Sequence, residues 1–522
     1  MKNVLKGVEA KMDIKMLKTQ VCANTIIGKQ SVEHPIDVDF TIPDYCGEIE
    51  RILKCIFIPR INSKSVSGQN IMIDGHVTVR LIYCNSENKI FSFEHLVPFT
   101  KGIEMKGVDD KTKIKAEVKC SYCNCRAVTQ RKVDVHGAIE IKIVAKGENK
   151  SQVVCDVESD DIQILKGSAP MLNSKGYCEK ALILDEEIEI GQGQPEIVSL
   201  IRSSAAPCIT DMKIINGKVL LRGEMQICVL YCGPDNRPVI MRSGVPFSQV
   251  LDIDDASEDC KCSCDIEVAY FEVKPKTTPS GQVRLLALSA KLMVTGECFC
   301  QDDVPVILDA YSVCGEMEAK YTEVEFEKIC CSYNENIICT AQNEIMGGSI
   351  GSIVDMWCEV GNVNTHFSNE TLTMNGVVKA FILLYDANGN AFFSEKPIDF
   401  EYSFNHDGLG DKVYTNPQIE AINCSYTITG ENSIEIRVEL KITGGIYEIG
   451  KMPMVTDIVQ SENKPKNKEN AAAMVIYYAE SGERIWDIAR KYNSSVDEII
   501  AINELTVDVL PFEKTLIIPL AQ

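Results

Sequence analysis

The residues best suited to chemistry in this sequence are cysteines, which gather in short clusters. Cys120, Cys123 and Cys125 stand close together, and the first two have the C-x-x-C spacing that brings two thiolates to one zinc ion. A four-thiolate zinc site needs two such pairs. The other clusters follow C-x-C patterns, which place both thiols on one face of a strand, where free cysteine behaves as a small hydrophobic residue. They contain Cys260, Cys262, Cys264, Cys298 and Cys300. We expect no metal and no other cofactor, although the spacing at Cys120 leaves a metal role open.

Groups that would serve catalysis are sparse. The six histidines include no H-E-x-x-H pair, and the chain has neither a G-x-S-x-G elbow nor a G-x-x-x-x-G-K-[ST] phosphate loop. Glycine-rich stretches at 191–193 and 347–351 lack the lysine or the strand-turn-helix setting that phosphate binding needs. Acidic runs such as 185–187 are typical of solvated edges rather than of acid/base pairs. We expect no enzymatic activity.

Composition and charge describe a folded acidic protein. Its 522 residues are 45% hydrophobic and 25% charged, and they carry a formal net charge of −22. Such a charge repels nucleic-acid phosphates and anionic membrane surfaces. Charged residues interrupt the apolar runs at the N-terminus and every stretch of 18 residues, which argues against a signal peptide and against a transmembrane helix. We expect a cytoplasmic location with reduced thiols, no nucleic-acid partner, and only indirect association with membranes.

One set of marker residues recurs three times along the chain. In each copy a glycine is followed 24 positions later by a phenylalanine, with an apolar segment between them that contains a tyrosine. The first two copies are offset by 148 positions, and the second and third glycines by 153. The pairs are Gly75 and Phe99, Gly223 and Phe247, and Gly376 and Phe400. This agreement indicates an internal repeat of about 150 residues.

Each copy is predicted to be a β domain. Its closing segment alternates polar and apolar residues and is rich in valine and isoleucine, as in strands with one buried face. The predicted fold class is mainly β, with three tandem antiparallel repeats, each a sandwich or partly open barrel, and then a small βααβ domain. The glycines are expected at bulges or bends and the Tyr and Phe residues in the core. The predicted domains are repeat 1 at 1–165, repeat 2 at 166–312, a divergent repeat 3 at 313–458, a flexible linker at 459–473 and the last domain at 474–522.

The last domain resembles a LysM domain. Two strand-like segments, 474–478 and 515–519, enclose two short amphipathic helices. LysM domains usually bind N-acetylglucosamine chains of peptidoglycan or chitin through the loop after the first strand and the loop before the last. The family commonly has Gly-Asp-Thr/Ser-Leu and Pro-Gly-Gln there. This chain has Gly482-Glu483-Arg484-Ile485 and Pro511-Phe512-Glu513 instead.

These replacements favour a protein partner over a glycan, because exposed aromatic residues and arginines are typical anchors of protein interfaces. The opening strand would extend the same surface. The predicted partner-binding residues are Met474, Ile476, Glu483, Arg484, Trp486, Phe512 and Glu513. The alternative is that Trp486 belongs partly to the core and that Phe512 only covers the helix pair.

The β repeats resemble the SPOCS domains of spore-coat-associated proteins. The matching residues in the first copy are Ile42-Pro43, Glu48-Ile49, Ile52-Leu53, Gly75, Tyr83 and Val97-Pro98-Phe99, and the third copy lacks the glutamate. Tandem SPOCS-like repeats followed by one LysM domain are similar to a clostridial family of coat morphogenetic proteins that interact with the protein SpoIVA.

This resemblance implies a non-enzymatic role in sporulation. Members of the family bind the coat morphogenetic ATPase SpoIVA through the LysM domain. They lie with SpoIVA in the mother-cell cytoplasm at the forespore surface, later in the spore coat, and couple coat assembly to engulfment. Three stacked repeats would form a long scaffold that could also contact other coat proteins, and the linker would let the LysM domain search for its partner. The alternatives are a peptidoglycan-binding LysM protein of the cell wall or spore cortex, and a metalloenzyme or redox protein.

Overall fold

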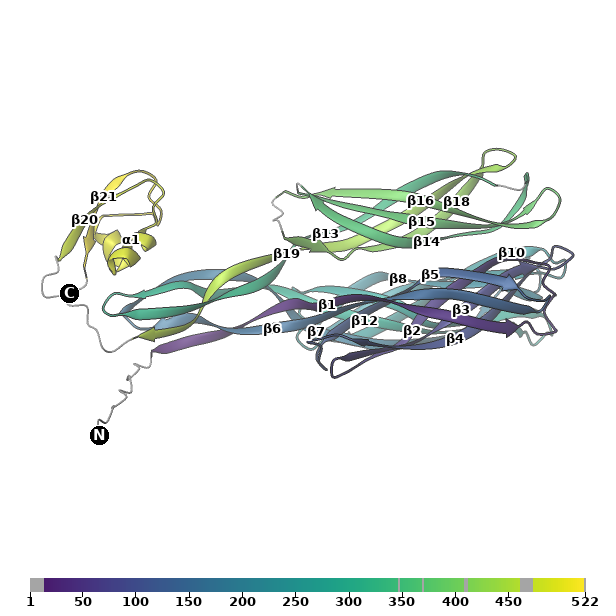
Figure 1. Ribbon diagram of the computed structural model, residues 1–522, viewed down its shortest axis with the longest axis horizontal. Coiled ribbons are helices and arrows are strands. Elements are labelled where there is room, and N and C mark those ends of the chain that lie inside the picture. The colour runs from purple at the N-terminus through teal and green to yellow at the C-terminus, as the bar shows by residue number, and fades with distance from the viewer. Residues whose placement is uncertain (1–13, 346–347, 369, 408–411, 461–472, 521–522) are drawn as a thin grey trace, which may run out of the picture.

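The computed structural model describes residues 14–345, 348–368, 370–407, 412–460 and 473–520, and it is built almost entirely of antiparallel strands (Figure 1). Most of the predicted linker lies outside these residues. The first repeat contains β1 Lys15–Thr41, β2 Arg51–Ser67, β3 Asn70–Cys84, β4 Ile90–Glu104, β5 Lys113–Ala127 and β6 Lys132–Glu158. The second contains β7 Ile162–Glu189, β8 Ser199–Ile215, β9 Lys218–Cys232, β10 Pro238–Asp252, β11 Lys261–Thr277 and β12 Val283–Ser312. The third contains β13 Met317–Glu344, β14 Ile350–Ser368, β15 Thr371–Asp386, β16 Ala391–Asn405, β17 Val413–Thr415, β18 Gln418–Ile428 and β19 Ser433–Gln460.

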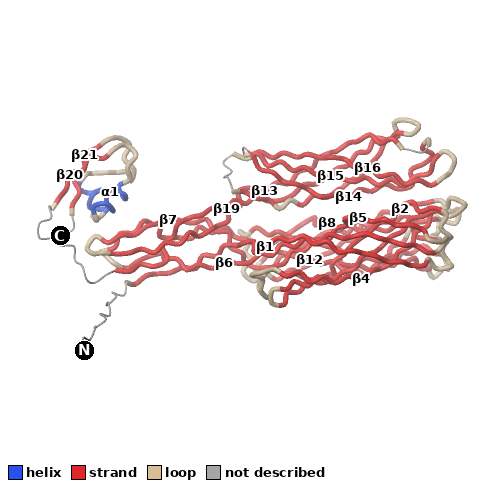
Figure 2. The backbone as a smooth tube through the Cα atoms, in the orientation of Figure 1, coloured by secondary structure: helices blue, strands red, loops and turns tan. Residues whose placement is uncertain are grey.

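The C-terminal domain follows with the predicted βααβ order. It consists of β20 Met474–Ala479, α1 Ile485–Tyr492, α2 Val496–Ile502 and β21 Lys514–Pro519. Its two helices are the helical segments of the described chain (Figure 2). None of the described helices is long and apolar enough to cross a membrane.

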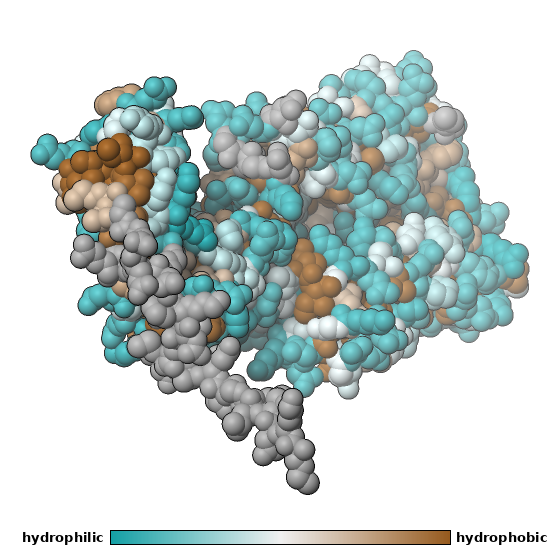
Figure 3. Space-filling view, turned by 60° about the vertical axis from the view of Figure 1, so that its left-hand side comes forward, coloured by the Kyte–Doolittle hydropathy of each residue, from teal (hydrophilic) through white to brown (hydrophobic). Residues whose placement is uncertain are grey.

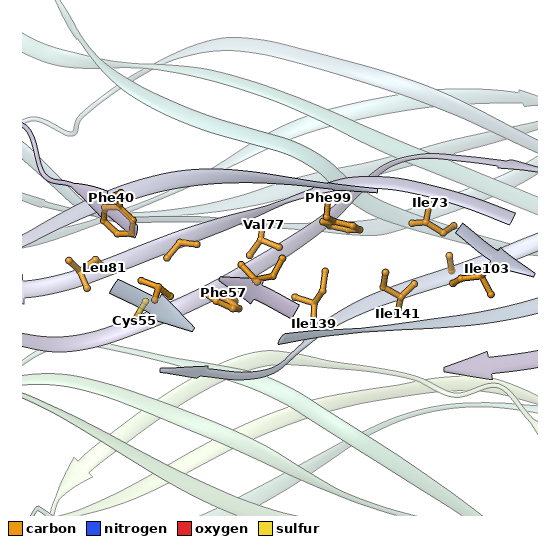
Figure 4. Close-up of a cluster of buried hydrophobic side chains, with 14 of the residues drawn as sticks. Phe40, Cys55, Phe57, Ile73, Val77, Leu81, Phe99, Ile103, Ile139 and Ile141 are labelled. Atoms are coloured by element: carbon orange, nitrogen blue, oxygen red, sulfur yellow. The ribbon is translucent and has the colours of Figure 1, made fainter. Parts of the chain in front are cut away.

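Each repeat is a sandwich of two sheets. In the first repeat the sheet β1-β6-β5 packs on the sheet β2-β3-β4, and the same order returns as β7-β12-β11 on β8-β9-β10. The third repeat pairs β14-β15-β16 with a sheet in which both β17 and β18 lie against β19. Buried and less buried residues alternate along β3, so that one face enters the core (Figure 4). The predicted fold class is confirmed.

The recurring glycine and phenylalanine sit opposite each other on neighbouring strands, which explains their constant spacing. Gly75 pairs with Phe99, Gly223 with Phe247 and Gly376 with Phe400. A Cβ added to Gly75 would lie 2.3 Å from the carbonyl oxygen of Arg60 and 2.5 Å from the ring of Phe99. Glycine is needed here because the phenylalanine ring and a bulged strand approach its backbone on the same side.

The boundaries of the repeats follow from strand pairing. Because β7 pairs with β12 over its whole length, from Ile162 to Glu189, all of β7 belongs to the sheet of the second repeat. The last strand of the second repeat, β12, ends at Ser312. The third repeat continues to Gln460, the last residue of β19.

The three sandwiches lie side by side around a common axis (Figure 1). Ile82, Leu230 and Leu383 occupy equivalent positions in the three repeats, are fully buried, and belong to one cluster on this axis. The segments that contain them are buried on both strand faces, one face toward the sandwich core and the other toward the neighbouring repeats.

Polar contacts close the ring between the repeats. Arg80 of the first repeat donates to the carbonyl oxygen of Ser203 in the second over 2.8 Å. Arg202 of the second repeat pairs with Asp355 of the third at 2.7 Å, and Lys54 of the first pairs with Glu395 of the third at 2.6 Å. The same position of the three repeats is occupied by Lys54, Arg202 and Asp355. It therefore carries a cation in the first two repeats and an anion in the third.

The strands β1, β6, β7, β12, β13 and β19 are 27 to 30 residues long and extend beyond the sandwiches as a three-ribbon stalk (Figure 1). Val153, Val306 and Met454, again equivalent, fill its apolar interior. The stalk ends beside the C-terminal domain, so the tip of the β body and the last domain become neighbours.

The cysteines differ in part from expectation. Reduced thiols were expected, but the structure contains three disulfides, which join Cys260 to Cys300, Cys262 to Cys298 and Cys358 to Cys424. The C-x-C residues face each other across β11 and β12, where antiparallel pairing brings their thiols together.

The cluster with the C-x-x-C spacing is divided by the fold. Cys123 and Cys125 pack against the first sandwich core next to Cys55, whereas Cys120 is exposed. Hydrogen bonding from these neighbours, together with burial, raises the pKa of Cys55 far above its usual range. In the described part of the chain no group of three or more Cys, His, Asp or Glu residues has a metal-binding arrangement.

Candidate partner-binding site

The C-terminal domain presents one face of its small sheet to solvent. Its strands β20 and β21 pair antiparallel, and α1 and α2 pack on the inner face through residues such as Ile485, Ile488 and Ile499. Ser495 caps α2 by accepting a hydrogen bond from the backbone N–H of Glu498. The inner face and the helices form the domain's core, so the outer face has no covering element of its own.

The outer face is apolar. Met474, Ile476 and Tyr478 alternate along β20 with inward residues and are 60%, 65% and 78% exposed. Ile517 lies opposite Ile476 on β21 and is also exposed. Figure 3 shows an apolar patch on this part of the molecule, next to the grey atoms. Surface methionine, isoleucine and tyrosine gathered on one flat face are typical of protein interfaces.

The loop after β20 and the loop before β21 are joined to each other by backbone hydrogen bonds. The backbone N–H of Gly482 donates to the carbonyl oxygen of Leu510 over 2.8 Å. The backbone N–H of Leu510 in turn donates to the backbone carbonyl oxygen of Glu483 over 2.9 Å. Phe512, at the tip of the second loop, is 65% exposed. Arg484 and Glu513 are exposed as well, but Arg484 also borders the gap between this domain and the second repeat.

The side chain of Glu483 stabilises the turn that follows β20. Its carboxylate accepts hydrogen bonds from the hydroxyl of Tyr477 at 2.8 Å and from the backbone N–H of Glu480 at 2.8 Å. The hydrogen bond to Glu483 raises the pKa of Tyr477. This carboxylate therefore closes the turn after β20.

Trp486 lies apart from the exposed residues. It is only 8% exposed and faces the tip of the second repeat, where its indole Nε1–H donates to Asp309 over 2.9 Å. Its ring also meets Tyr311 edge-on, with ring centroids 5.0 Å apart. Of the seven predicted residues, Trp486 thus contacts the β body, Glu483 closes the turn after β20, and the other five are exposed. Their part in partner binding stays a prediction.

Sequence reasoning overlooked three residues of this region. Tyr478 and Ile517 belong to the exposed face, and the alternation along β20 together with the pairing of β21 would have identified them. Asp309 is 177 positions from Trp486 in the chain, and no local pattern marks it as a contact of the C-terminal domain.

Comparisons with protein families agree with this architecture. The model of the SipL SPOCS domain matches residues 48–128 and 196–276, which span the strands β2 to β5 and β8 to nearly the end of β11. The model of the LysM domain matches residues 477–519. No match was found among curated proteins, and none among solved structures. The third repeat lies outside the matched segments but has the same two-sheet arrangement.

The chain therefore contains two segments that match the SPOCS domain and one that matches the LysM domain, and both are families of non-catalytic domains. Two SPOCS domains of the SipL type followed by a C-terminal LysM domain match the architecture of SipL, and they fit a SipL-like sporulation protein.

Proposed function

We propose that this chain is a non-enzymatic scaffold of spore coat morphogenesis that binds the coat ATPase SpoIVA through its LysM domain. It acts in the mother-cell cytoplasm, at the forespore surface during engulfment, and later in the coat. The β body offers further surfaces for other coat proteins. Its net charge of −22 opposes direct binding to an anionic membrane, so a protein partner supplies the attachment.

The observation that supports this proposal most is the apolar outer face of the LysM sheet. Met474, Ile476, Tyr478 and Ile517 are exposed although they lie on a paired sheet, and no described element of the chain covers them. An uncovered apolar face of this kind is a place where a partner can bury surface. Phe512 and Arg484 add the aromatic and arginine side chains that commonly dominate binding energy.

Substitution of Ile476 by lysine tests this site in the full chain. A buried cation at the centre of the interface is expected to cost at least about 2 kcal/mol, a weakening of roughly thirtyfold in affinity for purified SpoIVA. Leu96→Lys is the matched control, because Leu96 is an exposed apolar residue on β4 in the first repeat. Affinity is measured by titration with SpoIVA. Equal binding by wild type and Ile476→Lys would place the interface elsewhere.

The alternative of peptidoglycan binding is favoured by the LysM match. Arg484 and Asp508, which come from the two loops of the family-typical groove, line the gap between the LysM domain and the second repeat. A long glycan chain would have to displace that contact. Sedimentation of the full chain with insoluble peptidoglycan decides between the two functions, and retention there without SpoIVA binding would overturn the proposal.

A further inference from the structure

The LysM domain rests on a built docking site at the tip of the second repeat. We propose that this contact is an internal latch: it covers Trp486 and competes with the external protein partner for that part of the LysM surface. The inference rests on the proposed function for the identity of the partner. The docking itself stands on the geometry alone.

Asp309 is the centre of the docking site. Its Oδ2 accepts hydrogen bonds from the indole Nε1–H of Trp486 at 2.9 Å and from the guanidinium of Arg490 at 2.6 Å. Its Oδ1 accepts from the hydroxyl of Tyr321 at 2.6 Å and from the backbone N–H of Ala310 at 2.8 Å. Both oxygens are thus fully used, and the carboxylate is held by Ala310 of its own repeat and by Tyr321 of the third repeat while it binds the LysM domain.

Two further contacts orient the domain. The hydroxyl of Tyr311 donates to the backbone carbonyl oxygen of Ser494 over 2.7 Å, and burial raises the pKa of this tyrosine, which keeps its proton in place. The side chain of Gln163 accepts from the backbone N–H of Val496 at 3.3 Å. These contacts hold the start of α2, whereas Asp309 holds α1, so both helices are fixed.

The docking surface is specific to the second repeat. Asp156, Asp309 and Asp457 stand at equivalent places next to a bulge in the three ribbons of the stalk. Asp156 pairs with Lys166, and Asp457 pairs with Lys18 and Lys320. The place of Tyr311 is taken by a glutamate in the first repeat and by a valine in the third, at positions 158 and 459. Only the second ribbon combines the aspartate with an aromatic side chain.

The interface between the second repeat and the LysM domain is not fully packed, as is expected of an interface that can open. A cavity of about 380 Å³ lies between the tip and the LysM domain, lined by residues such as Ile164, Leu165, Arg484 and Asp508. Much of the LysM surface, including Met474, Ile476 and Phe512, stays exposed in the docked state. A partner can therefore begin to bind on the exposed face and gain Trp486 once the latch opens.

The first experiment measures docking in the absence of any partner. In the full chain carrying Trp357→Phe, Trp486 is the only tryptophan. Asp309→Ala is expected to shift its emission to longer wavelength and to increase its quenching by acrylamide severalfold, because the indole becomes exposed. Asp457→Ala is the matched control, since it removes the equivalent aspartate of the third ribbon, which pairs with Lys18 and Lys320 rather than with the LysM domain. Unchanged quenching in Asp309→Ala would overturn the latch.

The second experiment measures competition. A protein that binds only in the undocked state loses affinity in proportion to the docked fraction, so a latch closed in about nine of ten molecules lowers the apparent affinity about tenfold. Asp309→Ala is expected to recover this factor toward SpoIVA, while Asp457→Ala is expected to bind as wild type. A second variant, Tyr311→Glu, places the first repeat's residue in the second and is expected to act like Asp309→Ala.

The outcomes separate the two proposals. Greater exposure of Trp486 together with tighter SpoIVA binding supports the latch. Greater exposure with equal or weaker SpoIVA binding overturns the competition, because the docked form would then be the one that binds. If neither wild type nor Asp309→Ala binds SpoIVA, the proposed function fails and the competition with it, whereas the quenching data still decide whether the LysM domain docks.

Discussion

The ion pair between Arg202 and Asp355 offers the sharpest test of how the repeats are held together. Their side chains are 5% and 0% exposed, and Arg202 also lies over the ring of Trp357 at 4.5 Å. The second oxygen of Asp355, Oδ1, is buried and has no hydrogen-bond partner in the described chain. Arg202 is therefore the main compensation for a buried negative charge at the junction of the second and third repeats.

Substitution of Arg202 by methionine should be strongly destabilising. Removal of one member of a buried pair commonly costs about 3–5 kcal/mol, because the remaining charge is left without compensation. The double variant Arg202→Met/Asp355→Leu should regain most of this loss, since apolar residues of similar size can replace a buried pair at little cost. The coupling energy of the double-mutant cycle is expected to be at least about 2 kcal/mol.

The ion pair of Lys54 with Glu395, which joins the first and third repeats, is the control. Its side chains are 30% and 33% exposed, so water screens the charges, and Lys54→Met should cost no more than about 1 kcal/mol. Unfolding in urea, followed by the emission of Trp357 in a Trp486→Phe background, reports on this junction. Equal losses in Arg202→Met and Lys54→Met, or additive effects of the two changes at the buried pair, would refute the reasoning.

Two further changes test the interior of the repeats. Gly75→Ala should destabilise the first repeat by about 1–3 kcal/mol, because the new methyl group meets the ring of Phe99. In urea unfolding, the double variant Gly75→Ala/Phe99→Leu should recover part of this loss. If the single variant loses no stability, the close approach of the ring to Gly75 is contradicted. Burial, and then the nearby charge of Asp265, raise the pKa of Glu267 to about 6 in the folded chain. A raised carboxyl pKa favours the protonated folded state, so stability should fall by about 2 kcal/mol as pH rises from about 4.5 to 6, and then level off. Glu267→Gln should flatten this part of the pH profile, and an unchanged profile would show that another group is responsible.

Much of the local structure could be predicted from the sequence. Alternation of valine and isoleucine with polar residues specified strands, because a strand places every second side chain on the same face. The constant distance from Gly75 to Phe99 and from Gly223 to Phe247 reflected a hairpin register, which depends only on residues close in the chain. The exposed positions Met474 and Ile476 followed from the same alternation.

The arrangement of the repeats and the position of the LysM domain were decided by tertiary structure. The segment that ends in Ile82 and Tyr83 is apolar on both faces, which signals burial on both, but it does not say which surface provides the second cover. That surface is the equivalent segment of the other repeats, about 150 and 300 positions away. For Trp486 the sequence left an interface and a place in the core as alternatives, since its acceptor, Asp309, belongs to a distant strand. Local patterns determine which side chains share a face, whereas the partner of that face depends on contacts between segments that only the folded chain brings together.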